Sequence, residues 1–300
     1  RLVSDWSSDV CSSDLQTLYR NGQRRLFSAR SRDGRAWSEP EMLAHIDMGD
    51  YQISWPRGGH VATAFDMHPS TGRAGKGLNY RSNIYYLETP DAGRTWRNAK
   101  GEAVQLPLTD IRNPALVLDS VSQDRNVYLK DLDFDAQGRP VILYLTSKGY
   151  EPGPASGPFE WHTARWTGRE WEHRRMGESD HNYDHGALYV EKDGAWRVIA
   201  PTDPGPQPFG TGGGMVMWLS RDQGARWRRV RELTKGSERN HSYARKPLNA
   251  HPDFYALWAD GNPLEPSKSL IYFCTRDGKV FVLPEKMNTG RAKPAAVEPR

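Results

Sequence analysis

The sequence predicts an all-β protein, and three observations support this fold class. Short runs rich in β-branched and aromatic residues recur along the chain, as expected for strands. Turns built from Asp and Gly lie beside these runs, which is typical of antiparallel hairpins. The sequence shows no long amphipathic helical pattern. The clearest strand candidates are residues 83–88, 141–145, 215–219 and 270–274.

Two of the turns carry a longer pattern that links the turn to a Trp. Residues 89–96 are Thr-Pro-Asp-Ala-Gly-Arg-Thr-Trp, residues 220–227 are Ser-Arg-Asp-Gln-Gly-Ala-Arg-Trp, and both fit the hairpin signature known as an Asp-box. We expect Asp91 to accept backbone N–H groups across its turn, Gly93 to take a positive φ, and Trp96 to pack between sheets. Residues 31–37 hold a version shortened by one residue. These turns indicate the fold but do not identify a catalytic or binding site.

The recurrence of strand, turn and strand indicates a β-propeller. The turns are separated by about 25 to 60 residues, and one four-stranded blade takes about 40–45 residues. The chain would then make six or seven blades, and we predict seven, with the first incomplete. We assign residues 16–287 to a single propeller domain and expect the Pro-, Ala- and Lys-rich residues 288–300 to form a disordered tail.

The first fifteen residues form a segment that we set apart from the fold. Residues 5–15 are what a common sequencing adapter gives when it is translated in frame. We therefore predict that residues 1–15 are not native and that the natural N-terminus, with any signal peptide, is missing. Cys11 then falls outside the native chain, which leaves Cys274 alone and predicts no intramolecular disulfide. Without this segment, 40 basic and 34 acidic residues give a net charge of +6, against +4 for the whole sequence.

Composition restricts the class of partner. Mean hydropathy is −0.78, but aromatic residues make up 11% of the chain, and disordered chains lack such large apolar groups. No apolar run approaches the ~20 residues of a membrane span. The positive charge favours a polyanion, yet the basic residues are scattered and no nucleic-acid-binding motif is present. We expect an anionic polysaccharide as partner, no nucleic acid, no membrane and a monomer; an ordinary solvated basic surface is the alternative.

Several longer motifs resemble those of one known family. Residues 59–65 (Gly-His-Val-Ala-Thr-Ala-Phe), 77–86, 182–186 (Asn-Tyr-Asp-His-Gly) and 240–247 (Asn-His-Ser-Tyr-Ala-Arg-Lys-Pro) are similar to runs in the BNR-type propeller polysaccharide lyases, which include the ulvan lyases. The resemblance covers most of residues 45–285. It implies a β-propeller enzyme that cleaves a uronate-containing polysaccharide by β-elimination, and a secreted or periplasmic location.

The resemblance also implies roles for individual residues. β-Elimination needs a group that neutralises the uronate carboxylate, a base that removes the C5 proton and an acid that protonates the departing oxygen. By resemblance, His60 and Tyr183 are the acid–base pair, Arg197 neutralises the carboxylate, and Tyr243 is a further active-site residue. His titrates near neutral pH and Arg can form paired hydrogen bonds to a carboxylate, so these residue types suit the roles. Which member of the pair is the base depends on whether the uronate is glucuronate or iduronate.

One position departs from the family pattern. Tyr80 stands where the family has a second His, twenty residues after His60. A Tyr can hydrogen-bond to sugar but cannot readily carry positive charge, so we assign Tyr80 to substrate binding and leave the polymer unassigned beyond ulvan-like. The matching motifs supply three further substrate-binding candidates, His185, Asn240 and Arg245.

Catalysis of this kind requires no cofactor, and the only metal that we consider is a structural zinc or calcium ion. Cys274 lies on a predicted strand, where a free thiol is normally a buried structural residue. The alternative makes Cys274 a zinc ligand with His251 as its companion. The spacing of the two residues matches no recognised zinc motif.

Two other functions remain open from the sequence. A sialidase-like glycoside hydrolase would share the Asp-boxes, but it needs paired catalytic groups that the sequence does not reveal. A non-catalytic glycan-binding propeller is the second alternative, and Tyr80 favours it. Both the lyase and a binder derived from it predict that His60, Tyr183 and Arg197 converge at one mouth of the central channel.

Overall fold

The computed structural model describes residues 12–20, 22–70 and 79–297. In this part of the chain the regular structure consists of β-strands and one short 3₁₀ turn, Pro154–Ser156. The all-β prediction is therefore confirmed. No helix among these residues has the length and apolar character needed to cross a membrane. Residues 1–11 of the segment predicted to be non-native, and residues 298–300 of the predicted tail, lie outside the described residues.

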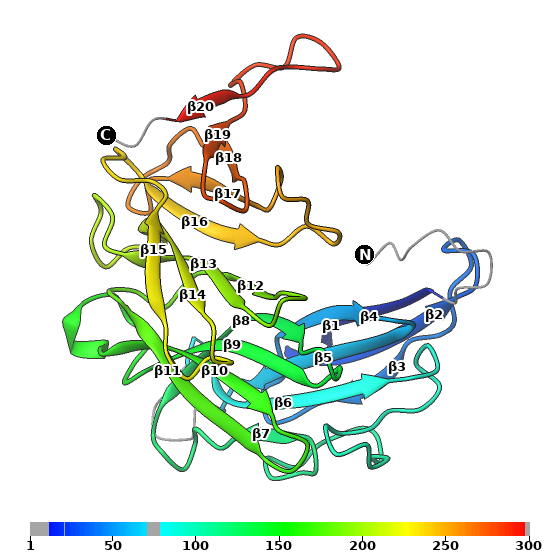
Figure 1. The fold of residues 1–300 in the computed structure, drawn as a ribbon. Helices are drawn as coiled ribbons and strands as arrows, with labels where there is room; N and C mark the ends of the chain where they lie inside the picture. The colour runs from blue at the N-terminus through cyan, green and yellow to red at the C-terminus, as the bar shows by residue number, and fades with distance from the viewer. Residues whose placement is uncertain (1–11, 21, 71–78, 298–300) are drawn as a thin grey trace. The chain divides into compact units, whose positions relative to one another are not determined.

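The described strands form five sheets, in which strands that follow one another in the sequence are hydrogen-bonded neighbours (Figure 1). The first sheet contains β1 (Ser12–Arg20), β2 (Gln23–Ser31) and β3 (Glu41–Ala44). The second contains β4 (Gln52–Arg57), β5 (His60–Met67), β6 (Ser82–Thr89) and β7 (Leu116–Leu118). The third contains β8 (Asn126–Phe134), β9 (Pro140–Ser147), β10 (Phe159–Trp166) and β11 (Trp171–Ser179).

The two remaining sheets carry the C-terminal part of the chain. One contains β12 (Ala187–Val190), β13 (Trp196–Asp203), β14 (Gly214–Ser220) and β15 (Arg228–Glu232). The other contains β16 (Asn240–Arg245), β17 (Ala256–Gly261), β18 (Ile271–Cys274), β19 (Val280–Val282) and β20 (Ala295–Val297). Sheets of about four sequential strands are the repeating unit of a propeller. The described residues hold five such sheets, so a total of seven blades stays a prediction.

Contacts divide the chain into two compact units, residues 1–142 with 164–172, and residues 143–163 with 173–300. In the first unit Phe65 of β5 stacks on Tyr85 of β6 with ring centroids 5.3 Å apart, and all eight residues of β6 are buried. In the second unit Tyr189 of β12 stacks on Tyr255 at 4.1 Å, beside the buried Trp258 of β17. Aromatic burial thus supplies much of each core. The assignment of residues 16–287 to one domain stays a prediction.

The turn after β6 has the contacts that its sequence predicts. The Asp91 carboxylate accepts the backbone N–H of Thr95 at 2.9 Å and the Thr95 hydroxyl at 2.7 Å. Gly93 has a φ of 87°, a left-handed conformation that glycine adopts without a steric penalty. Trp96 is buried in the core of the first unit. The turn therefore links the end of β6 to that core.

The turn after β14 is built in the same way. The backbone N–H of Arg226 and the hydroxyl of Ser220 donate to Asp222 and lower the pKa of its carboxyl. Gly224 has a φ of 84°, and a Cβ at this position would lie 2.8 Å from the Trp196 ring. A side chain at residue 224 would thus be both strained and obstructed.

Two stretches that we expected to lie outside the fold contribute strands. The last four residues of the segment predicted to be non-native belong to β1, whose Ser12 pairs with Ser31 of β2. Residues 295–297 of the predicted disordered tail form β20, which pairs with β19. Backbone hydrogen bonds at the edge of a sheet require no particular side chains, so sequence composition did not reveal either strand.

Candidate active site

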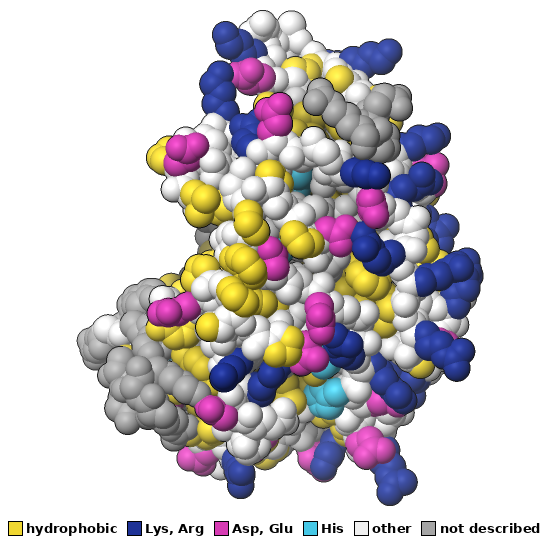
Figure 2. Space-filling view, turned by 90° about the vertical axis from the view of Figure 1, so that its left-hand side faces the viewer, with side chains coloured by type: hydrophobic (Ala, Val, Ile, Leu, Met, Phe, Trp, Pro, Cys, Tyr) yellow, Lys and Arg dark blue, Asp and Glu magenta, His cyan; other side chains and the backbone are white. Residues whose placement is uncertain are grey.

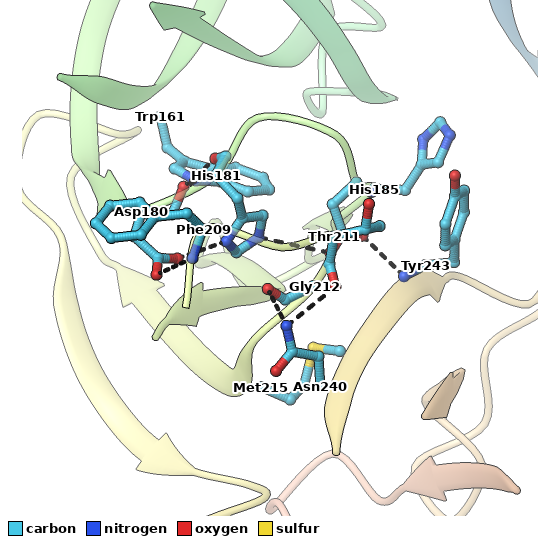
Figure 3. Close-up of polar contacts among 12 residues, drawn as sticks. Trp161, Asp180, His181, His185, Phe209, Thr211, Gly212, Met215, Asn240 and Tyr243 are labelled. Atoms are coloured by element: carbon cyan, nitrogen blue, oxygen red, sulfur yellow. Dashed lines mark hydrogen bonds and ion pairs between the residues drawn. The ribbon is translucent and has the colours of Figure 1, made fainter. Parts of the chain in front are cut away.

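Three segments of the second unit meet at the candidate site (Figure 3). They are the 180–186 loop between β11 and β12, the 204–213 loop between β13 and β14, and strand β16. The first loop carries the predicted residues Tyr183 and His185, and β16 carries Tyr243. The three segments come from separate parts of the chain, so tertiary contacts must fix their relative positions.

His181 is the buried centre of these contacts. Its Nδ1 lies 2.8 Å from Oδ1 of Asp180, and its Nε2 lies 3.7 Å from Oδ2 of Asp184, which is an ion pair longer than a hydrogen bond. The imidazole is 3% exposed. Burial alone would lower the pKa of His181, but the two carboxylates together raise it above its ordinary value of 6.5. The contacts therefore favour a charged imidazolium between two carboxylates.

Each carboxylate also anchors a neighbouring segment. Oδ2 of Asp180 accepts the backbone N–H of Phe209 at 2.9 Å, which fixes the 204–213 loop. Oδ1 of Asp184 accepts the backbone N–H of Tyr243 at 2.8 Å, which fixes β16. Burial would raise the pKa of Asp180, but its hydrogen bonds to His181 and Phe209 lower it below 3.8. The three residues act as one ionic clamp, which we call the Asp180–His181–Asp184 clamp.

The clamp leaves two tyrosine side chains exposed beside it. Tyr183 is 44% exposed and Tyr243 is 41% exposed. The His185 ring is half-buried, with its centroid 5.2 Å from that of Tyr243. The structure therefore brings the predicted residues His185 and Tyr243 together, on segments that the clamp also joins to Tyr183. Phenol and imidazole groups are suited to proton transfer, which is the chemistry expected of this site.

Asn240, a predicted substrate-binding residue, contacts the 204–213 loop. Its side chain is buried, and its Nδ2 donates to the carbonyl oxygens of Gln207, Thr211 and Gly212 at 2.9–3.3 Å. Its Oδ1 accepts the backbone N–H of Gln207 at 3.1 Å. The amide is thus fully engaged with the 204–213 loop. Asn240 therefore holds the loop, and a role in substrate binding stays a prediction.

The structure does not bring Arg197 to Tyr183. Arg197 of β13 lies opposite Tyr189 of β12, near the end of β12 that leads into the 191–195 turn. The 180–186 loop leads into the other end of β12. Its Nε lies 2.9 Å from Glu191, and Glu191 also binds Arg276. Arg197 lines a separate groove with Arg231 and Arg276. A protein carboxylate thus already engages the Arg197 guanidinium, and the expectation that Arg197 neutralises a uronate stays a prediction.

Arg245 remains a cation beside the clamp. It is exposed, lies two residues beyond Tyr243 at the end of β16, and makes no ion pair with any described residue. A guanidinium without an acidic partner can bind a carboxylate of a ligand. The prediction that Arg245 binds substrate is compatible with this position.

The two predicted residues of the first unit lie apart from one another. His60 begins β5, directly after the turn formed by Gly58 and Gly59. Tyr80 is buried and precedes β6, whose Ser82 pairs with the last residue of β5. At ~3.3 Å per strand residue, the length of β5 separates the two ends by roughly 23 Å. The convergence of His60 with Tyr183 stays a prediction.

The described residues supply no third ligand for a zinc ion held by Cys274 and His251. Cys274 is fully buried on β18, and burial raises the pKa of its thiol to about 12, which opposes the thiolate that zinc requires. The His251 side chain is 70% exposed. Within the described ranges, no three His, Cys, Asp or Glu side chains are grouped closely enough to hold a metal ion.

Asp180, His181 and Phe209 organise the site but are not among the predicted site residues. The pattern Asp-His-x-x-Asp at residues 180–184 was a usable signal, since it places a carboxylate on each side of a His. Phe209 follows Pro208 in a loop rich in Pro and Gly, and nothing in that composition marks a site. Its role depends on contacts with segments about thirty residues away.

The fold is a β-propeller that resembles solved carbohydrate-active enzymes. An ulvan lyase of polysaccharide lyase family PL25, solved with -[GlcA(1-4)Rha3S]- bound, is similar with a TM-score of 0.69 and 18% identity over 88% of this chain and 64% of that one. The Trypanosoma rangeli sialidase is similar with a TM-score of 0.53 and 12% identity over 92% of this chain and 46% of that one. These likenesses show the fold.

The sequence comparison defines the family. Residues 13–179 match the model of the BNR repeat-containing family, and the chain belongs to this family. An ulvan lyase of Nonlabens ulvanivorans is 26% identical over 178 residues, which are 53% of this chain and 37% of that protein. The chain thus covers less than two thirds of the length of these ulvan lyases. The family match ends directly before the 180–186 loop.

Proposed function

We propose that the protein is a polysaccharide lyase that cleaves an acidic, uronate-containing polymer by β-elimination. The observation that carries this proposal is the gathering of Tyr183, His185 and Tyr243 around one buried clamp. The likeness to ulvan lyases supports it from sequence and from fold. Glucuronate is part of the ligand bound to one of those lyases, so a uronate polymer is the first substrate class to test.

The proposed reaction divides the work among residues of the site. A base takes the C5 proton, the electron pair of that C–H bond forms the C4–C5 double bond, and the bond from C4 to the departing oxygen breaks. An acid then protonates that oxygen. We assign proton transfer to Tyr183 and His185, and charge neutralisation of the carboxylate to Arg245 in place of Arg197. His60 is retained as an alternative partner of Tyr183.

The hydrolase alternative is less well supported by this site. Most glycoside hydrolases need two carboxyl groups that flank the scissile bond, whereas sialidases use a Tyr nucleophile, which we expect to be paired with a Glu. The two carboxylates beside Tyr183 belong to Asp180 and Asp184, and both are bound to His181 and to backbone N–H groups. Groups that serve as anchors are not available for that role.

A polymer substrate also accounts for the expected secreted or periplasmic location, since polymers do not cross a cell membrane.

Ultraviolet absorbance of the protein incubated with uronate polymers tests the proposal. β-Elimination creates a conjugated unsaturated uronate that absorbs in the ultraviolet, whereas hydrolysis creates only new reducing ends. We expect absorbance to rise with ulvan or with a glucuronate homopolymer, and not with a neutral glucan as the matched control. New reducing ends without absorbance would replace the lyase with a hydrolase. Neither signal, together with retained binding of a polymer, would indicate a non-catalytic glycan-binding protein.

A further inference from the structure

Two exposed aromatic residues at the site share an unusual backbone conformation. Phe209 and Tyr243 both have a φ of 60°, and they are the only aromatic residues with a positive φ among the described ranges. A bulky residue is sterically opposed to this left-handed region. Such strain persists only where surrounding contacts impose it, and it is concentrated at functional sites. Both side chains nevertheless remain in contact with solvent, at 37% and 41% exposure.

The same clamp binds the backbone of both residues. The backbone N–H of Phe209 donates to Asp180 at 2.9 Å, and the backbone N–H of Tyr243 donates to Asp184 at 2.8 Å. His181 lies between the two carboxylates and is paired with each. In Figure 3 Phe209 and Tyr243 lie on opposite sides of His181. One buried imidazole thus fixes two aromatic residues at two separate places.

The loop that carries Phe209 is held at further points. Asn240 of β16 binds carbonyl groups of the loop on both sides of Phe209, those of Gln207 and Thr211. Gly210 lies so close to Pro263 that a Cβ there would be 2.4 Å from the proline ring. An exposed phenyl group on a loop fixed in this way loses little conformational freedom when a ligand binds.

We infer that Phe209 and Tyr243 are two stacking contacts for one glycan chain, so that the site takes a segment of several sugars rather than a single sugar. An aromatic ring packs against the apolar C–H face of a pyranose and excludes water from it. Two rings on opposite sides of His181 contact the chain at two places, with Tyr183 on the loop between the two clamp carboxylates. Phe209 belongs to none of the family motifs and has no role in the proposed proton transfers, so this contact is new.

This inference rests on the proposed polysaccharide substrate. A binding measurement on protein that does not cleave the polymer tests the stacking contacts separately from the proposed lyase reaction. We would introduce Phe209→Gly into Tyr183→Phe protein and measure its mobility in native gels that contain ulvan or a glucuronate homopolymer. Glycine adopts a φ of 60° freely and retains the backbone N–H to Asp180, so the loop keeps its anchor while the ring is lost. Phe254→Ala is the matched control, because Phe254 is 42% exposed and packs on Phe273, in another part of the same unit.

We expect Phe209→Gly to weaken binding to the retarding polymer by about tenfold, which corresponds to the loss of one aromatic contact, with an unchanged melting temperature. The control should bind as the parent does. A short oligosaccharide series should show affinity rising with length in the parent and less so in Phe209→Gly. Parent-like binding by Phe209→Gly, or no retardation of the parent by either polymer, would overturn the inference. Retained binding in a protein that shows no lyase activity would remove the proposed reaction and leave this inference in place.

Discussion

Tyr183→Phe is expected to lower the rate of unsaturated product formation by about 10²–10⁴-fold, the range that one proton-transfer group contributes. The substitution removes a single hydroxyl from a side chain that is 44% exposed, so the fold should be unaffected. KM should change little, because the ring that contacts the substrate is retained. Initial rates of ultraviolet absorbance over a range of polymer concentrations measure both quantities.

Tyr272→Phe is the matched control for this prediction. The Tyr272 hydroxyl donates to Asp260 at 3.2 Å. Tyr272 lies on β18, which is none of the three segments of the site, so the loss of this hydroxyl should leave the rate of product formation unchanged. His185→Ala and His60→Ala distinguish the two assignments of the second proton-transfer group. A large loss in His60→Ala with a normal rate in His185→Ala would return the role to His60. A normal rate in Tyr183→Phe would remove Tyr183 from the chemistry.

His181→Ala is expected to destabilise the protein by about 3–5 kcal/mol, the usual cost of leaving a buried ionic group without its partner. Asp184 is buried and would lose the charge that faces its Oδ2. The anchors of the 204–213 loop and β16 would weaken together, since both carboxylates lose their common partner. Chemical denaturation at pH 6 measures the effect. His251→Ala, at an exposed position, should change stability by less than about 0.5 kcal/mol.

The same clamp predicts how stability depends on pH. Because folding raises the pKa of His181 above 6.5, its contribution is fully present below that pH and is lost as the pH rises through the raised pKa. Because folding lowers the pKa of Asp180, its contribution is present above 3.8 and is lost as the pH falls through the lowered pKa. The clamp should therefore contribute most to stability between about pH 4 and 6.5, and His181→Ala should remove the decline in stability that His181 causes above this range. An alkaline decline of equal size in His181→Ala would show that another group causes it.

The features that the sequence predicted correctly are local. Asp91, Gly93 and Trp96 lie within one turn, so the residue types alone determine which N–H groups meet the carboxylate and which residue takes a positive φ. Strand runs such as β6 are similarly visible, because its four central residues, Ile-Tyr-Tyr-Leu, form a continuous apolar and aromatic run. Fold class follows from these local rules together with their recurrence.

The motifs did not reveal the polar contacts that engage two of the predicted site residues. Arg197 matched a family motif, but Glu191 already binds it, and Glu191 also binds Arg276, which lies 85 residues further along the chain. Asn240 resembled a substrate ligand, but its amide is engaged by a loop about thirty residues earlier. The backbone N–H of Phe209 donates to Asp180, 29 residues before it. Sequence motifs do not record which polar groups a tertiary contact has already satisfied.

The charged surface does not by itself locate the site. Figure 2 shows Lys and Arg side chains spread over the face in view, with Asp and Glu among them. The scattered basic residues of the sequence thus remain scattered on this face. A general attraction for polyanions is compatible with such a surface, but position and orientation of a substrate require the fixed aromatic and polar groups of one site.

The most direct test of the account is the crystallographic position of a uronate oligosaccharide bound to Tyr183→Phe protein. We expect a chain of several sugars that crosses the clamp, packs on Phe209 and Tyr243, and places one uronate beside the ring of residue 183 and within hydrogen-bonding distance of Arg245. An oligosaccharide seated in the groove lined by Arg197 and Arg276, with the clamp region free of sugar, would contradict it.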